Sequence, residues 1–444
     1  MVTLTIVPSR LLCRLAHIPL LLLLVTAGAD AATLTLPAAI AAALRTQPQI
    51  CQSAHDASAS RDLSRAAHAA TLPQISLAAG SIWSESRAGQ PLFVSANGPR
   101  EVIGQLRVSF PLYDPQLSAL AQVARDQSVV AQWQYQATRL KVVATVVNDY
   151  YRLATLLTQE RIWNSTFSTA EKLFRDTQRA YRAGAVSRLD LVQTELLRNK
   201  ARTGLQQSAA EVRAAMQVMN LQMGLPRRSV WELPKVSDSI QPLPAFHALA
   251  AQAETAQPLL QVVKRQIDVA QAQVDVQRGA TLPTVRAYGA YGVDTATVPR
   301  GNDLGWQGAL NLSIPIFGFG AHGQQIAAAQ ERVAALRSAR EALILQIRSR
   351  IAQDYGAARA ARKTLANTRR AAQEAERVYV MTREGYFAGA INALNLAQAE
   401  SSWVRARLEL ASAAVAVRLT RIQLDLDTGR YPTGPTGISP ISCP

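Results

Sequence analysis

The sequence predicts an α+β membrane protein in which very long helices are joined to pairs of strands, and in which this arrangement occurs twice. Three observations predict this fold class. Ordered internal matches recur along the 444 residues at a nearly constant offset. Long stretches contain almost no helix-breaking residues, and four short segments alternate apolar with polar side chains. Hydrophobic residues make up 48% of the chain but aromatic residues only 6%, which suits closely packed helices better than a thick globular core.

The N-terminus has the layout of a secretory signal peptide. Arg10 and Arg14 precede the apolar run Ile18–Val25, and small residues follow. We therefore expect residues 1–31 to be removed after export; an uncleaved anchor is the alternative. The apolar run is too short to span a bilayer as a stable helix. A net charge of +16 usually suggests nucleic acid or an acidic membrane surface as partner, and export argues against nucleic acid.

Self-comparison indicates that the chain is duplicated. Gln47-Pro48 recurs as Gln257-Pro258, and the segment 181–185 recurs as 386–390. The expected organisation is a signal peptide at 1–31, a first repeat at 32–224, a proline-rich connector at 225–244, a second repeat at 245–428 and a flexible C-terminal tail at 429–444. Each repeat is expected to contain a helix, two strands, a long helix, a turn and a further helix.

Each repeat contains a segment that predicts an exceptionally long helix. Residues 116–183 contain neither glycine nor proline, and residues 324–384 are interrupted only by Gly356. At 1.5 Å per residue these helices would be about 100 Å and about 90 Å long. Helices of that length need partner helices along them, as in a coiled coil or an elongated bundle. A soluble antiparallel coiled coil explains the helices equally well, so the strands decide between the two interpretations.

Four segments alternate with the period of a β-strand. The alternation is clearest at 306–316 and 102–110, and weaker at 75–83 and 285–293. About ten residues of alternation with aromatic residues at the ends is the pattern of a transmembrane β-strand. The aromatic residues expected at the membrane interfaces are Trp83, Phe110, Trp306 and Phe317. Loops rich in glycine, proline and asparagine, at 84–100 and 294–305, join each pair.

Four strands cannot close a membrane barrel, because the smallest closed barrels need about eight. An open sheet edge cannot face lipid either, since its backbone groups would lack hydrogen-bond partners. Two, three or four chains would supply about 8, 12 or 16 strands in all. The same chains would bring their long helices together into a tube beneath the barrel, and such a tube is a conduit.

These features together resemble the TolC family of outer-membrane factors. The resemblance extends from about Leu34 to Leu426. Its marks are Leu36-Pro37-Ala38-Ala39-Ile40 with Gln47-Pro48, the strand starts Leu72-Pro73 and Leu282-Pro283, Pro111 and Pro315 at the strand exits, and the duplicated Tyr-x-x-Gly turns. It implies a homotrimer with a 12-stranded barrel in the outer membrane and a helical tunnel through the periplasm. It also implies passive export, with a periplasmic adaptor (a membrane fusion protein) and an inner-membrane ABC or proton-driven transporter as partners.

The resemblance places two turns at the periplasmic tip, where adaptor hairpins dock. Gly184 and Gly389 each follow a long helix, and glycine there can adopt the left-handed conformation that ends a helix. They would be helix caps in any protein. Small residues around them would let a partner hairpin approach closely, and the six positions are Ala183, Gly184, Ala185, Ala388, Gly389 and Ala390.

The family's closed tip is held by polar links between inner helices. The Tyr and Asp of one link match Tyr386 and Asp190, whereas the Arg of a second link is replaced by Ile391. The family's acidic rings fall on the neutral amides Asn395 and Gln398, so we expect weaker cation selectivity. Four arginines crowd the first tip, either as a solvated face or as a surface complementary to an acidic adaptor or cargo: Arg175, Arg179, Arg182 and Arg188.

No catalytic motif, metal cluster or cofactor fingerprint stands out, and the five histidines are scattered. A channel with no energy source of its own must take its energy from a partner. The cysteines outside the signal region, Cys51 and Cys443, could pair in an oxidising periplasm.

The class of exported substrate is inferred from the region that follows the predicted signal peptide. No lipid-anchoring cysteine follows the signal region. This favours type I secretion of a protein, with multidrug or small-molecule efflux as the alternative. Two other classes remain open, namely a soluble periplasmic coiled-coil adaptor or scaffold and, less favoured, a basic nucleic-acid binder.

Overall fold

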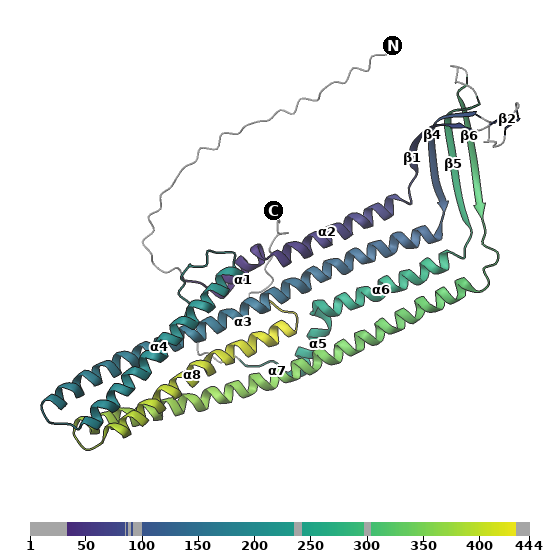
Figure 1. Cartoon of the computed structure of the whole chain (residues 1–444). Helices are drawn as coiled ribbons and strands as arrows, with labels where there is room; N and C mark the ends of the chain where they lie inside the picture. Colours follow the sequence, from purple (N-terminus) through teal and green to yellow (C-terminus); the bar gives the residue numbers. More distant parts are fainter. Residues whose placement is uncertain are drawn as a thin grey trace, which may run out of the picture.

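A computed structural model describes residues 33–84, 86–87, 90–91, 100–234, 242–296 and 303–431. The molecule is elongated, with a β-sheet at one end and the two turns that connect pairs of helices at the other (Figure 1). Between them, helices run along the long axis of the molecule. The predicted signal peptide at 1–31, most of the predicted tail and Cys443 lie outside the described residues. Cys51 is disulfide-bonded.

The first repeat begins with two consecutive helices, α1 (Leu36–Thr46) and α2 (Pro48–Ala69), which lead into strand β1 (Gln74–Trp83). The two-residue strands β2 (Ser86–Arg87) and β3 (Gln90–Pro91) form a small separate ribbon. Strand β4 (Arg100–Tyr113) returns to the helical part. The long helix α3 (Pro115–Arg182) and the helix α4 (Arg188–Gln222) then form a hairpin.

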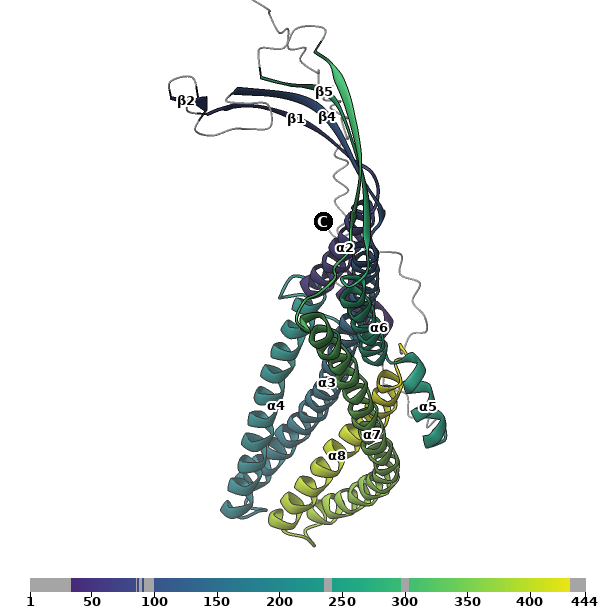
Figure 2. The same cartoon turned by 90° about the vertical axis from the view of Figure 1, so that its right-hand side faces the viewer.

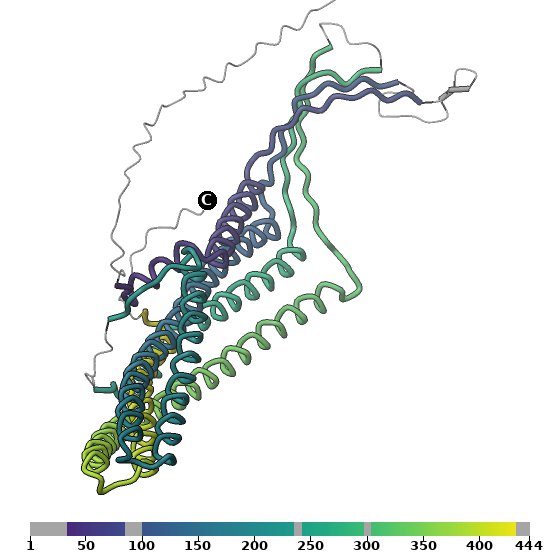
Figure 3. Tube along the Cα trace, turned by 60° about the vertical axis from the view of Figure 1, so that its left-hand side comes forward, coloured from purple at the N-terminus to yellow at the C-terminus, as the bar shows by residue number. Residues whose placement is uncertain are grey.

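The second repeat has the same order of elements. Helices α5 (Phe246–Ala256) and α6 (Pro258–Gly279) precede strands β5 (Thr284–Thr295) and β6 (Gly305–Ser313). Helices α7 (Ala321–Phe387) and α8 (Ala393–Asp427) form the second hairpin. The predicted duplication and the combination of strand pairs with very long helices are confirmed. Figure 3 lets the reader follow both passages of the chain from helix to strand and back.

The prediction of one helix before each strand pair was wrong, because each such helix is split in two. Gln47 and Gln257 separate the two parts, with ψ angles of 120° and 118°. Both precede a proline, whose ring clashes with a helical conformation in the residue before it. The Gln-Pro pairs that repeat in the sequence are therefore helix breaks.

The long helices are stabilised by shorter helices that follow each other along their length. Helix α3 has 68 residues and packs against α2 in one half and α4 in the other. Helix α7 has 67 residues and packs in the same way against α6 and α8. The expected bounds 116–183 are close to those observed, whereas α7 extends beyond the expected 324–384 at both ends. Among the described helices, none is long and apolar enough to cross a bilayer.

The four main strands form one antiparallel sheet in the order β1-β4-β5-β6, and this sheet is strongly curved (Figure 2). Leu77 of β1 faces Leu106 of β4, which in turn faces Tyr291 of β5. Strand β6 ends at Ser313, so the expected strand over 306–316 was too long. Pro315 has no N–H for the ladder, and Pro283 precedes the first residue of β5, which pairs with Ser313.

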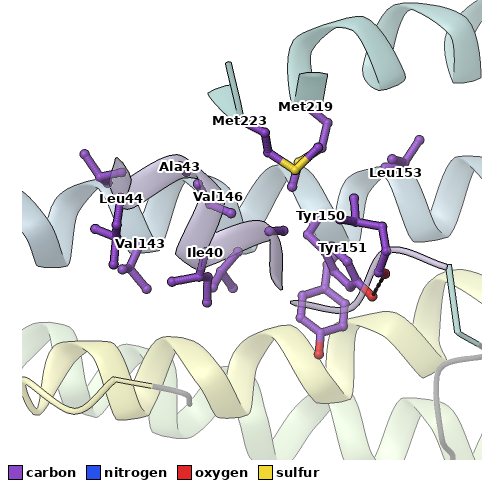
Figure 4. Packing of buried hydrophobic residues seen from close by; sticks show 14 of the residues in the cluster. Ile40, Ala43, Leu44, Val143, Val146, Tyr150, Tyr151, Leu153, Met219 and Met223 are labelled. Carbon is purple, nitrogen blue, oxygen red and sulfur yellow. Dashed lines mark hydrogen bonds between the residues drawn. The ribbon is translucent and has the colours of Figure 1, made fainter. Parts of the chain in front are cut away.

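The largest core lies where α1, α3 and α4 meet, at the middle of the molecule (Figure 4). Val146 and Met219 are fully buried there, and the hydroxyl of Tyr150 donates to the backbone oxygen of Leu34 over 3.1 Å. The second repeat builds a smaller version in which Ile351 and Leu424 occupy the matching positions. These two cores fix the shorter helices onto the long ones.

Candidate functional site: the two-faced sheet and the helical tip

One face of the sheet is apolar and exposed in the single chain. Ile75 is 70% exposed, Leu77 78%, and Leu310 72%. The strand register places the apolar residues of neighbouring strands in common rows across this face. Exposed apolar patches of this kind mark contact with lipid or with another apolar surface.

The opposite face of the same sheet carries polar side chains. The register aligns Ser76, Arg107 and Gln307 in or near one row. The amide of Gln105 donates to Asp294 over 3.0 Å, and Arg107 donates to Gln105 over 3.1 Å. An apolar face and a polar face on alternate residues are what a strand needs between lipid and a water-filled lumen.

The four predicted interface aromatics lie at or near the ends of their own strands. Trp83 and Trp306 lie at the strand ends away from the helices, and both are more than three-quarters exposed. Phe110 lies in β4 near the helical end, and Phe317 lies just beyond the end of β6. The guanidinium of Arg100 lies 5.6 Å from the ring centre of Trp83. The register places Trp306 opposite Tyr291, in the row of Leu77, whereas Trp83 pairs with Arg100. The location of these aromatic residues at the membrane interfaces stays a prediction.

Asp114 joins the sheet to the long helix. Its side chain accepts a hydrogen bond from the N–H of Leu117 over 3.0 Å and so caps the start of α3. It also pairs with Arg286 of β5 over 2.8 Å, although Asp114 itself is buried. This residue therefore fixes the angle at which the sheet meets the helices.

At the far end, the predicted turns have the same backbone geometry in both hairpins. Gly184 and Gly389 have φ angles of +74° and +73°. In each turn the following alanine donates to a carbonyl five residues earlier over 2.9 Å, which is the Schellman arrangement. The six predicted tip residues are all exposed, namely Ala183, Gly184, Ala185, Ala388, Gly389 and Ala390.

Asp190 connects the two hairpins. Its Oδ2 accepts from the N–H and the hydroxyl of Ser187 over 3.2 and 2.7 Å, which caps α4. Its Oδ1 accepts from the N–H of Ala393, the first residue of α8, over 3.4 Å. The hydrogen bond from Ser187 is the main reason why the pKa of Asp190 lies below its ordinary value. Nothing in the sequence indicates the contact with Ala393.

Tyr386 makes a different contact from the expected one. Its hydroxyl lies 3.1 Å from the hydroxyl of Thr177 on α3. In the described single chain, Tyr386 and Asp190 take part in two separate links, and the Tyr386–Asp190 link suggested by the family resemblance stays a prediction. Each of the two observed links joins the first hairpin to the second. Thr177 is 3% exposed, and only the tertiary structure identifies it as a partner.

A small core lies between the two hairpins above the turns. It contains one residue from each of the four helices: Leu173, Leu197, Tyr379 and Leu396. Tyr379 stacks on Trp403 with ring centres 4.5 Å apart. This packing holds the hairpins together in the absence of any partner chain.

Glu400 is buried at this seam. It is 3% exposed, and its Oε2 atom has no hydrogen-bond partner. Burial raises the pKa of this carboxyl to about 7. The sequence gives only a weak signal for this residue, which is that it shares a helical face with Leu396 and Val404.

The predicted amides Asn395 and Gln398 are exposed on one face of α8, whereas Leu396 and Ala399 are buried on the other. Ser402 and Arg405 continue the exposed stripe along the same face. No carboxylate occurs among these four positions of the stripe.

The four predicted tip arginines are all exposed. Arg175 pairs with Glu171 over 3.6 Å, and Arg179 pairs with Asp176. Arg182 and Arg188 flank the turn itself.

The sequence profile of the outer membrane efflux protein family matches residues 39–222 and 249–430, one match for each repeat. The outer membrane protein OprJ of Pseudomonas aeruginosa is 22% identical over 376 residues, which are 81% of this chain and 76% of OprJ.

Solved structures have the same fold. CusC, whose structures concern folding and transmembrane channel formation, superposes with a TM-score of 0.78 at 18% identity and covers 89% of this chain and 92% of its own. The MtrE outer membrane channel of Neisseria gonorrhoeae, solved in an open state, gives 0.76 at 18% identity and 89% coverage of both chains.

The two-faced sheet, the paired long helices and the duplicated profile match define an outer-membrane channel protein whose helical part extends into the periplasm. The chain belongs to the outer membrane efflux protein family, and thus to the TolC-like outer-membrane factors that its sequence resembles.

Proposed function

We propose that three copies of this chain close into one 12-stranded barrel that conducts substrate across the outer membrane. The main supporting observation is the four-stranded sheet, which has one apolar and one polar face. Its outer strands are β1 and β6. Successive strands of the sheet are antiparallel. The β6 of one copy and the β1 of the next therefore have the directions needed to continue the same antiparallel order. In a closed ring every strand edge has a partner, as lipid requires.

The hairpins of the three copies would then line a periplasmic duct. The exposed polar stripe of α8 that contains Asn395 and Gln398 has no covering element in the single chain. A water-filled passage suits such a stripe, since its side chains stay hydrated there. The link between Tyr386 and Thr177 and the link between Asp190 and Ala393 would hold the hairpins together near the narrow end.

We further propose that a periplasmic adaptor with an acidic face docks at the first turn. The duplication supports this, because the four arginines of the first tip have no basic counterparts in the second. The residues 205 positions later are Val380, Glu384, Phe387 and Ala393. The basic surface is therefore a property of one hairpin and not of the shared fold. Docking through it should weaken as salt is added. An inner-membrane transporter would supply the energy.

Two classes of substrate are supported by different observations. The match to the outer membrane efflux protein family supports efflux, for which we propose small molecules as the substrate. The sequence after the predicted signal peptide has no cysteine before Cys51, which supports the second candidate, type I secretion of a protein. Deleting the gene should sensitise the cells to small toxic compounds in the first case. In the second case it should remove a protein from the culture medium and leave sensitivity unchanged.

Cysteine cross-linking tests the proposed barrel. Leu77→Cys on β1 is combined with single cysteines at 306, 308, 310 or 312 on the matching face of β6. A covalent ladder up to a trimer is expected from at least one pair, and the purified protein should form conducting pores in planar bilayers. The control is Leu77→Cys with Leu106→Cys, which are paired within one chain and should give no ladder. Monomers from every β1–β6 pair, together with a lack of conductance, would contradict the proposal.

A further inference from the structure

The two repeats end in equivalent helix junctions. In the first repeat, Nε2 of Gln47 donates to the backbone oxygen of Gln222 over 2.9 Å. In the second, Nε2 of Gln257 donates to the backbone oxygen of Asp427 over 3.2 Å. Gln222 and Asp427 are the last residues of α4 and α8. The same backbone contact thus fastens the end of each hairpin to the break between the two helices that open its repeat.

The side chains at these junctions differ in one chemical respect. The amide of Gln222 donates to the carboxylate of Asp149 on α3, 73 positions earlier. At the same spacing in the second repeat, Asp427 meets Asp354 on α7. An amide facing a carboxylate has been replaced by a carboxyl facing a carboxyl. Arg350 also stands where the first repeat has Thr145.

The surroundings of Asp427 leave one of its oxygens without a donor. The residue is 7% exposed, and its Oδ1 lies 3.0 Å from Nε of Arg350. Its Oδ2 is buried and has no hydrogen-bond partner, and the carboxyl of Asp354 lies beside Asp427. Two ionised carboxylates cannot donate to each other. A single proton between them would supply the donor that is needed, and a similar arrangement occurs wherever two carboxylates share one site.

We propose that Asp354 and Asp427 form a proton-binding site in which one shared proton fastens the C-terminal end of α8 to α7. The site does not depend on the proposed export function. It occurs only in the second repeat, because the first satisfies the same contact with a permanent amide donor.

The other charged groups around the site are arranged as follows. Arg350 lies 4.0 Å from Asp354 as well as beside Asp427, and it favours ionisation of both. Lys141 of α3 lines the same cavity as Asp427, and Gln257 contributes a neutral amide from the α5–α6 break. Asp425 pairs with Arg421 over 3.4 Å. Arg430 lies further along the chain and acts on Asp425. On α5, Glu254 forms an ion pair with Arg348.

Burial, reinforced by the hydrogen bond and the charge of Asp354, raises the pKa of Asp427 to about 7 against the lowering effect of Arg350. Because this folded-state pKa is above the ordinary value of 3.8, the folded state binds the proton more tightly. The stabilisation is complete below about pH 4 and is lost as the pH rises through about 7. Loss of the proton leaves two like charges in contact and should loosen the end of α8.

A loosened C-terminal end of α8 would affect several neighbouring helices. The backbone oxygen of Asp427 accepts a hydrogen bond from the side chain of Gln257 at the α5–α6 break. Gln423, one turn earlier, donates to Asn148 of α3 over 3.4 Å. The end of α8 is thus a junction between both repeats. A change in its protonation alters how firmly the second hairpin is anchored.

Hydrogen exchange of the full-length trimer in detergent, with infrared spectroscopy, tests the site. Protection of the last turns of α8, corrected for the intrinsic rate, should fall by up to about tenfold per pH unit between about pH 4 and 7. Asp427→Gln copies the first repeat and should abolish this dependence. It should also remove about one protonated carboxyl band per chain at pH 6. Glu400→Gln removes a different buried carboxyl and should leave the dependence at α8 intact.

The reciprocal variant Gln222→Asp provides the matched control. It creates a carboxyl pair in the first repeat and should make protection at the end of α4 pH-dependent, with the end of α8 unchanged. Asp354→Asn should behave like Asp427→Gln, since it also replaces the proton with a permanent donor. The proposal is overturned if the wild-type end of α8 shows no pH dependence between about pH 4 and 8. It is also overturned if Asp427→Gln retains that dependence or the carboxyl band.

Discussion

The hydroxyl of Tyr386 lies 3.1 Å from the hydroxyl of Thr177, so that a side chain at the end of α7 is bonded to one near the end of α3. The matching tyrosine of the first repeat, Tyr181, is 39% exposed. The duplicated chain thus keeps a tyrosine at both turns, and among the described residues it is the second, Tyr386, that joins the hairpins.

Replacing Tyr386 with Phe should loosen the tip. A hydrogen bond of this kind contributes about 1 kcal/mol, so the equilibrium between joined and separated hairpins should shift about fivefold. In planar bilayers we expect longer or more frequent openings of the Tyr386→Phe channel. Tyr181→Phe removes an equivalent hydroxyl and should leave conductance unchanged. Equal effects of the two substitutions would show that the contact with Thr177 has no role in closure.

Asp190 should make the same tip sensitive to acid. Its pKa is lowered chiefly by the hydrogen bond from Ser187, so the ionised carboxylate is the form that stabilises the fold. This stabilisation is present above the ordinary pKa of about 4 and is lost as the pH falls through the lowered value. Channel openings should therefore increase below about pH 4. Asp190→Asn should remove this acid response, and an unchanged response would rule out Asp190 as its source.

The raised pKa of Glu400 predicts a pH response opposite in sign to that of Asp190. Its pKa is raised to about 7 by burial, so the protonated form stabilises the seam between the hairpins. That stabilisation is complete below about pH 4.5 and is lost as the pH rises through about 7. Glu400→Gln should therefore resist thermal unfolding better than the wild type at pH 8 and equally well at pH 5. If the variant is less stable at both values, Glu400 has an unseen partner.

The turn glycines allow docking to be separated from folding. A side chain built at Gly184 or Gly389 meets nothing within 4 Å, but both residues have a positive φ. Asn tolerates that conformation better than Ala does. Gly184→Asn should therefore fold and conduct normally, yet hinder a partner hairpin. Loss of export with unchanged single-channel conductance is the expected result. Normal export by both Gly184→Asn and Gly389→Asn would contradict docking at these turns.

Local rules account for much of what the sequence predicted correctly. The ends of α3 and α7 follow from the positions of Gly184 and Gly389, and the two-faced sheet follows from strict alternation. Even the misjudged elements obey local rules, since Gln47 breaks a helix because a proline follows it. The end of β6 was missed because it depends on the strand opposite, where Pro283 ends the pairing.

The contacts between helices could not be predicted in this way. Thr177 and Tyr386 are 209 positions apart, and nothing in the sequence indicates which faces of two long helices meet. Glu400 likewise lines the same cavity as Leu197 of α4, and nothing in the sequence pairs these two residues. The family resemblance pointed to the two turns, which the structure places between the helices of each hairpin, but the partners of each tip residue required the packed structure.

The amides of α8 predict the ion selectivity of the channel. Asn395 and Gln398 are exposed on the polar stripe that we assign to the duct, where Arg405 adds a positive charge. Neutral amides attract cations only weakly and a guanidinium repels them, so the wild-type channel should show little cation preference. A carboxylate within about 4 Å of a permeating ion contributes about 1 kcal/mol in water-like surroundings. Asn395→Asp with Gln398→Asp should therefore raise the cation-to-anion permeability ratio by about fivefold or more.

The control is the exposed Glu409→Gln, further from the tip on the same helix, which should change the ratio less. A wild-type channel that is already strongly cation-selective, and that loses this preference in Asn395→Ala or Gln398→Ala, would contradict the assignment.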